Sequence, residues 1–157
     1  LRDMGMCISP MNAFLISMGM ETLPLRLQKT SDNALAVAEF LEKHDKVAWV
    51  RYGGLKSSPN KALAQKYCPK GCGGLLTFGL KGGYEAGKKL VDSVKMISLV
   101  ANLGDSRTLV AHPSSMMHSQ LTEEQRKAAG AETETVRISV GIEDIADILK
   151  DLGQAMA

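Results

Sequence analysis

Several features that mark common functional classes are scarce in this 157-residue sequence. Aromatic residues make up 4% of it, which argues against a platform for stacking the bases of single-stranded nucleic acid. The net charge of +2 is too small to suggest a partner with a phosphate backbone. There is no apolar run near the roughly 20 residues that a membrane helix requires, and no signal-peptide pattern. We therefore expect no nucleic-acid partner, no membrane association and a cytoplasmic location.

Cysteine is also scarce, and the number and spacing of the cysteines limit the possibilities for disulfides and metal sites. The three cysteines are Cys7, Cys68 and Cys72, an odd number that argues against a disulfide framework and suits a reducing compartment. The pair at 68 and 72 could suggest a metal site. A structural zinc site needs four converging ligands, however, and only three histidines are available to help. We expect no bound metal.

What is present is the composition of an ordinary folded domain. Hydrophobic residues account for 45% and charged residues for 23%, which is typical of a globular chain long enough to bury a core. The sequence has no internal repeat, no low-complexity tract and no obvious linker. It begins at Leu1, in a segment that already leads into a helix, so we expect a fragment of a longer protein.

Periodicity and capping residues predict the helices. Ser9 and Pro10 form a helix start, with Gly19 as its expected end, and Thr122 with Gln125 forms a capping box. Apolar residues at helical spacing indicate the remaining helices. The expected helical ranges are 10–18, 22–44, 59–67, 84–94, 122–130 and 143–152.

Five short strands are expected at 47–52, 73–80, 97–101, 108–111 and 135–140. Mixed strands and helices without a repeat predict one α/β or α+β unit, with helices covering the sheet. The link at 103–107 is too short for a parallel crossover, so we expect a largely antiparallel sheet.

Arg137 is the residue with the clearest chemical potential. Alternation in the last strand places Val136 and Ile138 on one side and Arg137 on the other. A guanidinium fixed on a strand can bind a carboxylate through two parallel hydrogen bonds. Taken alone, an arginine on the polar face of a strand is more often a solvated surface residue, so its context has to decide.

The stretch from Gly82 to Lys89 is close to a phosphate-binding loop but fails two tests. Position 89 is lysine, so the hydroxyl that would hold magnesium is missing. Ala86 belongs to the apolar stripe of a helix, so Gly87 would lie inside that helix. We interpret the stretch as a glycine turn before a helix with exposed lysines.

Separated motifs carry a resemblance to the pyridoxal-phosphate-dependent enzymes of cysteine and methionine metabolism. This family holds cystathionine γ-synthase, methionine γ-lyase and O-acetylhomoserine sulfhydrylase. The whole chain resembles their C-terminal part, and the motifs occur in the family's order. They are ISPMNAF (8–14), GMETL (19–23), VRYGGL (50–55), GGLLTF (73–78), NLGD (102–105), HPSS (112–115), HS (118–119) and VRISVGIED (136–144).

The resemblance implies a C-terminal small domain of a fold-type I enzyme and a site for an amino-acid substrate. In the family, the arginine at the position of Arg137 binds the substrate α-carboxylate, and the turn at Asn102 and Leu103 lies at the same carboxylate. Many relatives have serine where this chain has Asn102. Plainer interpretations stay open: Asn102 as a residue that favours a tight left-handed turn, and His112-Pro113 as the end of a strand. We assign His118 no acid or base role.

The resemblance also implies what this chain lacks. The family holds pyridoxal 5′-phosphate on a lysine in a Ser-x-Thr-Lys-like context, and no lysine here has that context, so no catalytic or cofactor-binding residue is assigned to the chain. We expect residues 1–45 to link from an absent cofactor domain, residues 46–157 to form the C-terminal α/β domain, and the two to make one structural unit. The fragment alone should be inactive, and the complete enzyme should be a homotetramer.

The form Asn102-Leu103-Gly104-Asp105 is more similar to the O-acetylhomoserine sulfhydrylase branch. It implies conversion of O-acetyl-L-homoserine and sulfide to L-homocysteine and acetate, with Arg137 orienting the substrate. Met117 stands where relatives commonly have threonine, which leaves the substrate open. Methionine γ-lyase and cystathionine γ-synthase are the alternatives within the family. A stand-alone, non-catalytic ligand-binding domain is the alternative of another class.

Overall fold

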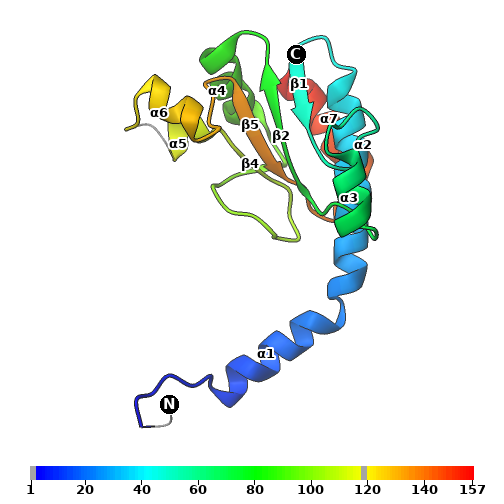
Figure 1. Ribbon diagram of the computed structural model, residues 1–157, viewed down its shortest axis with the longest axis vertical. Helices are drawn as coiled ribbons and strands as arrows, with labels where there is room; N and C mark the ends of the chain where they lie inside the picture. Colours follow the sequence, from blue (N-terminus) through cyan, green and yellow to red (C-terminus); the bar gives the residue numbers. More distant parts are fainter. Residues whose placement is uncertain (1–2, 118–119) are drawn as a thin grey trace.

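Five strands form one sheet in the computed structural model, which describes residues 3–117 and 120–157 (Figure 1). They are β1 (Val47–Arg51), β2 (Leu75–Leu80), β3 (Ser98–Leu99), β4 (Leu109–Ala111) and β5 (Thr135–Ser139). Their order across the sheet is β1-β2-β5-β4-β3, with β5 in the centre.

Three of the four strand pairs are antiparallel, which confirms the expected type of sheet. The exception is β3 and β4, which pair in parallel. The argument from a short link was wrong at this place because β3 ends at Leu99, two residues earlier than expected. The connecting loop therefore covers residues 100–108, enough for the chain to return and run beside β3 in the same direction.

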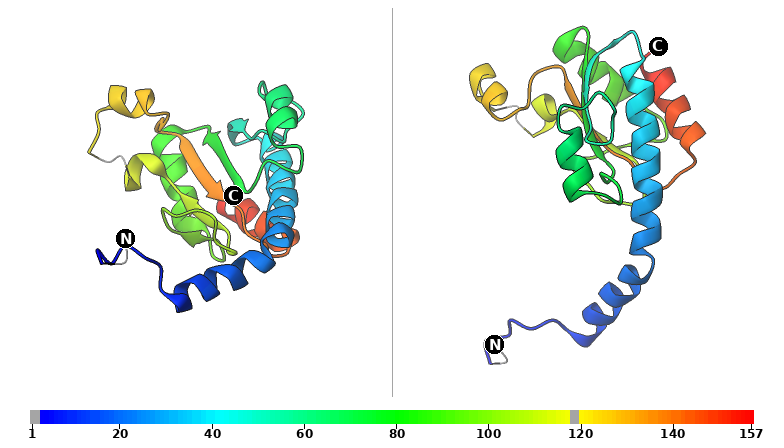
Figure 2. Two further views of the ribbon diagram at one scale, coloured as in Figure 1. Left: turned by 60° about the horizontal axis from the view of Figure 1, so that its bottom comes forward. Right: turned by 45° about the vertical axis from the view of Figure 1, so that its right-hand side comes forward.

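Helices α2 (Leu23–Glu42), α4 (Gly83–Ser93) and α7 (Ile145–Ala155) lie together on one face of the sheet (Figures 1 and 2). Their apolar stripes pack against alternate residues of the central strands, and this layer is the core. Phe78 of β2 and Leu41 of α2 are both fully buried in it. The covered sheet is the predicted fold class.

Helix α1 (Pro10–Glu21) projects away from the sheet (Figure 1). It begins as expected, because the Ser9 hydroxyl accepts a hydrogen bond from the Asn12 amide, 3.2 Å away. It does not end at Gly19, which lies inside the helix. None of its residues is buried, and Phe14 is 58% exposed, so its apolar side chains contribute nothing to the core of this chain.

Three shorter helices complete the described part of the chain: α3 (Lys61–Tyr67), α5 (Pro113–Met116) and α6 (Glu123–Ala128). The capping box of Thr122 and Gln125 at the start of α6 is confirmed in both directions. Helix α5 was not expected, because a single turn of four residues is too short to show a helical period. No helix in residues 3–117 and 120–157 is long and apolar enough to cross a membrane.

Candidate functional site

Arg137 lies at the middle of β5, the central strand. Its register partners are Thr77 on β2 and Ala111 on β4, and we call the side of the sheet that carries these three residues the Arg137 face. Val136 and Ile138 point the other way and are fully buried, so the predicted alternation is confirmed.

The Arg137 face of β5 is more enclosed than a half-buried strand would be. Thr135 is 2% and Ser139 is 5% exposed, and only Arg137 between them keeps a partly exposed side chain. The reason is local: β5 has strands on both sides, the loop at 100–108 covers Ser139, and Glu132 contacts Thr135. A guanidinium in this position is surrounded by fixed neighbours.

The structure brings Arg137 and Asn102 together across 35 residues of sequence. The Nη2 atom of Arg137 donates a hydrogen bond to the carbonyl oxygen of Asn102, 3.3 Å away. The Asn102 side chain accepts from the Leu103 amide at 2.9 Å, and Leu103 itself is 57% exposed. The left-handed residue of the turn is Gly104, with φ of 79°, and not Asn102.

The loop at 100–108 is attached firmly at its C-terminal end. Thr108 is fully buried, and its amide and hydroxyl donate to the two carboxylate oxygens of Glu143 at 2.6 and 2.8 Å. The Ile142 amide donates to the Ser106 carbonyl at 2.9 Å. Within the loop, hydrogen bonds from Arg107 lower the pKa of Asp105 to about 2. Glu143 and Thr108 were not singled out from the sequence.

A second arginine lies in the same row of the sheet but is already paired. Arg51 is the register partner of Thr77, and its guanidinium stacks 4.3 Å from the centre of the Trp49 ring. Its Nη2 atom is 3.5 Å from a carboxylate oxygen of Glu132. Trp49 lies flat across Gly79, where any side chain would collide with the indole.

Arg137 differs from Arg51 in its partners. Among the residues that the structure describes, the Arg137 guanidinium bonds to a peptide carbonyl and to no carboxylate. It therefore keeps an unneutralised charge and free N–H groups on a partly exposed face. Of the two, Arg137 is the one able to bind an external anion.

His112 is a structural residue. It is fully buried directly after β4, its Nε2 lies 2.8 Å from the Thr133 carbonyl, and its Nδ1 lies 2.9 Å from the Ser115 hydroxyl. A carbonyl oxygen can only accept, so Nε2 donates its proton to Thr133. The interpretation of His112-Pro113 as the end of a strand is confirmed.

Residues 118 and 119 lie outside the described part of the chain, so the motif at His118 and Ser119 is not placed by the structure. The neighbouring Met117, which stands in place of a common threonine, is 38% exposed just after α5.

The rejected phosphate loop is indeed the start of a helix. Helix α4 begins at Gly83, so Gly87 lies within it, as expected. Lys88 pairs with Asp92 one turn later, with 2.7 Å between the charged atoms. The segment offers no loop of free amides to a phosphate.

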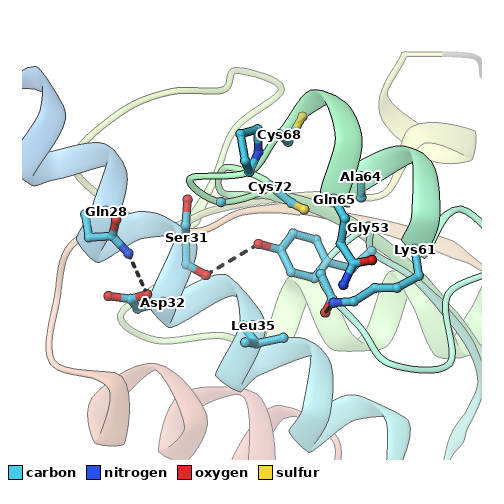
Figure 3. Close-up of a pocket in the computed structure, with 14 residues that line it drawn as sticks. Gln28, Ser31, Asp32, Leu35, Gly53, Lys61, Ala64, Gln65, Cys68 and Cys72 are labelled. Carbon is cyan, nitrogen blue, oxygen red and sulfur yellow. Dashed lines mark hydrogen bonds between the residues drawn. The ribbon is translucent and has the colours of Figure 1, made fainter.

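A pocket of about 430 Å³ lies between α2, α3 and the segment after β1 (Figure 3). None of Arg137, Asn102 and Leu103 lines it. Burial, followed by the nearby Cys72 and Asp32, raises the pKa of Tyr52 in its wall to about 12, and the Tyr52 hydroxyl donates to the Gly73 carbonyl at 2.8 Å. Cys68 and Cys72 line the pocket as free thiols. No group of three or more metal-ligating side chains occurs in the described residues.

A smaller pocket of about 150 Å³ lies beside the candidate site. Its walls include Leu103 and Gly104 from the loop, Leu75 from β2 and Ser139 from β5. It is lined mainly by apolar atoms, and the charged residues in its wall are Arg26 and Asp105.

The comparisons with known proteins all point to one enzyme family. A family model described as Cys/Met metabolism PLP-dependent enzyme matches residues 1–157. The chain belongs to this family. Within it, the chain is 50% identical to an O-acetyl-L-homoserine sulfhydrylase of Leptospira meyeri over 99% of its own length and 36% of that protein's. It is 48% identical to an L-methionine gamma-lyase of Treponema denticola, covering 39% of that protein.

A solved structure shows the same fold. It is a crystal structure of a protein described as an O-acetylhomoserine (thiol)-lyase from Campylobacter jejuni, which carries a pyridoxyl-lysine phosphate, the cofactor joined to a lysine. The TM-score is 0.89 and the identity 42%, and this chain covers 37% of that protein. The chain therefore spans between about a third and two fifths of its relatives, and it has the fold of part of a fold-type I enzyme.

Pyridoxal phosphate is the cofactor of this family, and the residues around Arg137 fit only one part of its site. The register neighbours Thr77 and Ala111 and the partner Asn102 supply neither an amine nor a phosphate-binding loop. One guanidinium with free donors suits a single carboxylate. This face of the chain therefore offers one anion-binding group and does not fit the cofactor itself.

Proposed function

We propose that this chain is the C-terminal part of a pyridoxal-phosphate-dependent γ-replacement enzyme, in which Arg137 binds the substrate α-carboxylate. The observation that supports the proposal is the position of Arg137 on a central strand, where its partner among the described residues is a carbonyl and not an acid. A rigid strand holds the planar fork in one orientation, so two parallel hydrogen bonds to a carboxylate cost little ordering entropy. Asn102 and Leu103 form the adjoining wall of this site.

The rest of the cofactor site lies elsewhere in this proposal. Residues 1–45 link from the cofactor domain, residues 46–157 form the C-terminal domain, and together they make one structural unit. Relatives more than twice as long as this chain support its assignment as one part of a larger polypeptide. The lysine that joins the cofactor would lie outside this chain, so the 157-residue chain is inactive alone, and the complete polypeptide is a homotetramer.

The role of this chain is positioning. When bound, the cofactor supplies an electron sink for bond breaking at the substrate α-carbon. Arg137 fixes the carboxylate, which sets the direction in which the Cα proton points, but it transfers no proton because its guanidinium stays charged. Thr135 and Ser139 precede and follow Arg137 by two residues, and both are almost fully buried, so the strand is shielded from water on either side of Arg137.

O-acetyl-L-homoserine is the proposed substrate, with sulfide as the nucleophile and L-homocysteine and acetate as products. Identity of 50% to an O-acetyl-L-homoserine sulfhydrylase supports it. Methionine cleavage is the second candidate, supported by 48% identity to an L-methionine gamma-lyase. A cystathionine-forming activity and a stand-alone ligand-binding domain are the remaining alternatives.

The test uses the complete polypeptide with pyridoxal phosphate. We expect homocysteine to form from O-acetyl-L-homoserine and sulfide at least tenfold faster than methionine is cleaved. Faster cleavage of methionine to an oxoacid, ammonia and methanethiol would assign the lyase function instead. The 157-residue chain, assayed in parallel, should give no homocysteine, and turnover by this chain alone would contradict the proposed division of the site.

A further inference from the structure

Two hydroxyl residues flank Arg137 on the same face of β5. Thr135 precedes it by two positions and Ser139 follows it by two, and both are almost fully buried. Their hydroxyls have different partners. The Thr135 hydroxyl donates to Glu132, 3.3 Å away, whereas the Ser139 hydroxyl accepts from the Gly104 amide at 3.0 Å.

Ser139 thereby attaches the loop that contacts Arg137. Gly104 follows Asn102 by two residues, and the Asn102 carbonyl accepts the hydrogen bond from Arg137. Two residues on the same face of β5 therefore hydrogen-bond to the two ends of the tripeptide 102–104. Arg137 contacts one end through its guanidinium, and Ser139 contacts the other through its hydroxyl. Leu103, between the two attachments, is 57% exposed.

Without the hydrogen bond between Gly104 and Ser139, the N-terminal half of the loop at 100–108 would be less constrained. Its C-terminal half is fixed separately, by the hydrogen bonds of Thr108 to Glu143 and of the Ile142 amide to the Ser106 carbonyl, but neither of these involves residues 102–104. Gly104 also has a left-handed φ of 79°, a conformation that glycine adopts without steric cost and leaves readily. The hydrogen bond to Ser139 is what selects one position for it.

We propose that Ser139 is a positioning residue for the carboxylate clamp: by fixing Gly104 it holds the Asn102 carbonyl, and so the orientation of the Arg137 fork. The inference rests on the proposed function of Arg137. Ser139 touches neither substrate nor cofactor in this proposal. Its effect should therefore appear only with substrates that carry the α-carboxylate.

The test compares Ser139→Ala with Thr135→Val in the complete polypeptide. Each change removes one buried hydroxyl two residues from Arg137 along the strand. Only Ser139→Ala removes the hydrogen bond to the Gly104 amide. The substrates are O-acetyl-L-homoserine and its α-carboxamide, which offers Arg137 no negative charge. We expect Ser139→Ala to raise KM for the acid about three- to tenfold with kcat within about twofold, the size of one neutral hydrogen bond. KM for the carboxamide should not change, and Thr135→Val should have neither effect.

Equal effects of Ser139→Ala on acid and carboxamide, or no effect on either, would overturn the inference. Hydrogen exchange of the Gly104 amide gives a second readout that does not need activity: protection in the wild type supports the attachment, and an unprotected amide overturns it. Arg137→Ala, measured beside them, separates the two proposals. If it raises KM for the acid while Ser139→Ala does not, only the positioning role fails. If it does not raise that KM, the clamp fails and Ser139 has nothing to position.

Discussion

The two arginines in the row across β1, β2 and β5 show how partners decide what a residue can do. Arg51 is stacked on Trp49 and paired with Glu132, so its charge is used within the fold. The pKa of Glu132 is lower than its ordinary value. A backbone hydrogen bond is the largest cause, burial opposes it, and the charge of Arg51 lowers the pKa further. Within residues 3–117 and 120–157, the hydrogen-bond partner of the Arg137 guanidinium is a carbonyl oxygen. Sequence patterns place both on strands, and only the structure separates them.

Asp151 on α7 provides a pH-dependent contribution to stability. Burial alone would raise its pKa, but hydrogen bonds from the backbone amides of Ile97, Lys95 and Met96 outweigh burial and leave its pKa below the ordinary value. A lowered pKa in the folded state stabilises the protein above the pKa of the unfolded chain, about 3.9. That contribution is lost as the pH falls through the folded-state value.

We therefore expect Asp151→Asn to lower the free energy of unfolding at pH 7 by about 1–3 kcal/mol, because an amide cannot accept all of these bonds. The difference from the wild type should shrink as the pH falls from about 4, where Asp151 of the unfolded chain becomes protonated, through the lower pKa of the folded state. Urea denaturation at several pH values measures it. A difference that stays constant with pH would show that the carboxylate charge is not what the three amides stabilise.

Among the elements, helices and their caps were the most predictable from sequence. Ser9, the capping box of α6 and the stripes of α2, α4 and α7 depend on residues close in sequence, and all are confirmed. The direction of β3 relative to β4 was not predictable, since it depends on where a two-residue strand ends. The burial of Ser139 depends on a loop 35 residues away, which no local period reveals.

Helices α1 and α2 are both apolar in part, yet they should respond differently to substitution. Phe14 on α1 is 58% exposed, whereas Leu41 on α2 is fully buried in the core. We expect Phe14→Ser to change the unfolding free energy of this chain by less than about 0.5 kcal/mol, and Leu41→Ala to lower it by about 2–5 kcal/mol. Chemical denaturation of the two variants measures both. A large loss from Phe14→Ser would mean that α1 packs against the sheet in solution.

At the scale of the whole molecule, the sheet separates two tasks. One face packs against α2, α4 and α7 and provides stability, while the other presents Arg137 from the most supported strand. A site on a central strand is held more rigidly than one on a loop, which suits a group that must orient a substrate. The sequence motifs indicated the family and the residue proposed as the clamp. That Arg137 has no carboxylate partner among the described residues could be learned only from the fold.

The most direct test of the carboxylate clamp is the effect of Arg137 variants on kcat/KM of the complete polypeptide for O-acetyl-L-homoserine and for its α-carboxamide. Loss of the charge-assisted pair should cost about 3 kcal/mol, so Arg137→Ala should lower kcat/KM for the acid roughly 100-fold and hardly affect the carboxamide. Arg137→Lys keeps the charge without the fork and should lower it about tenfold. Equal losses for acid and carboxamide, or no loss at all, would contradict the assignment of Arg137 as the group that binds the substrate carboxylate.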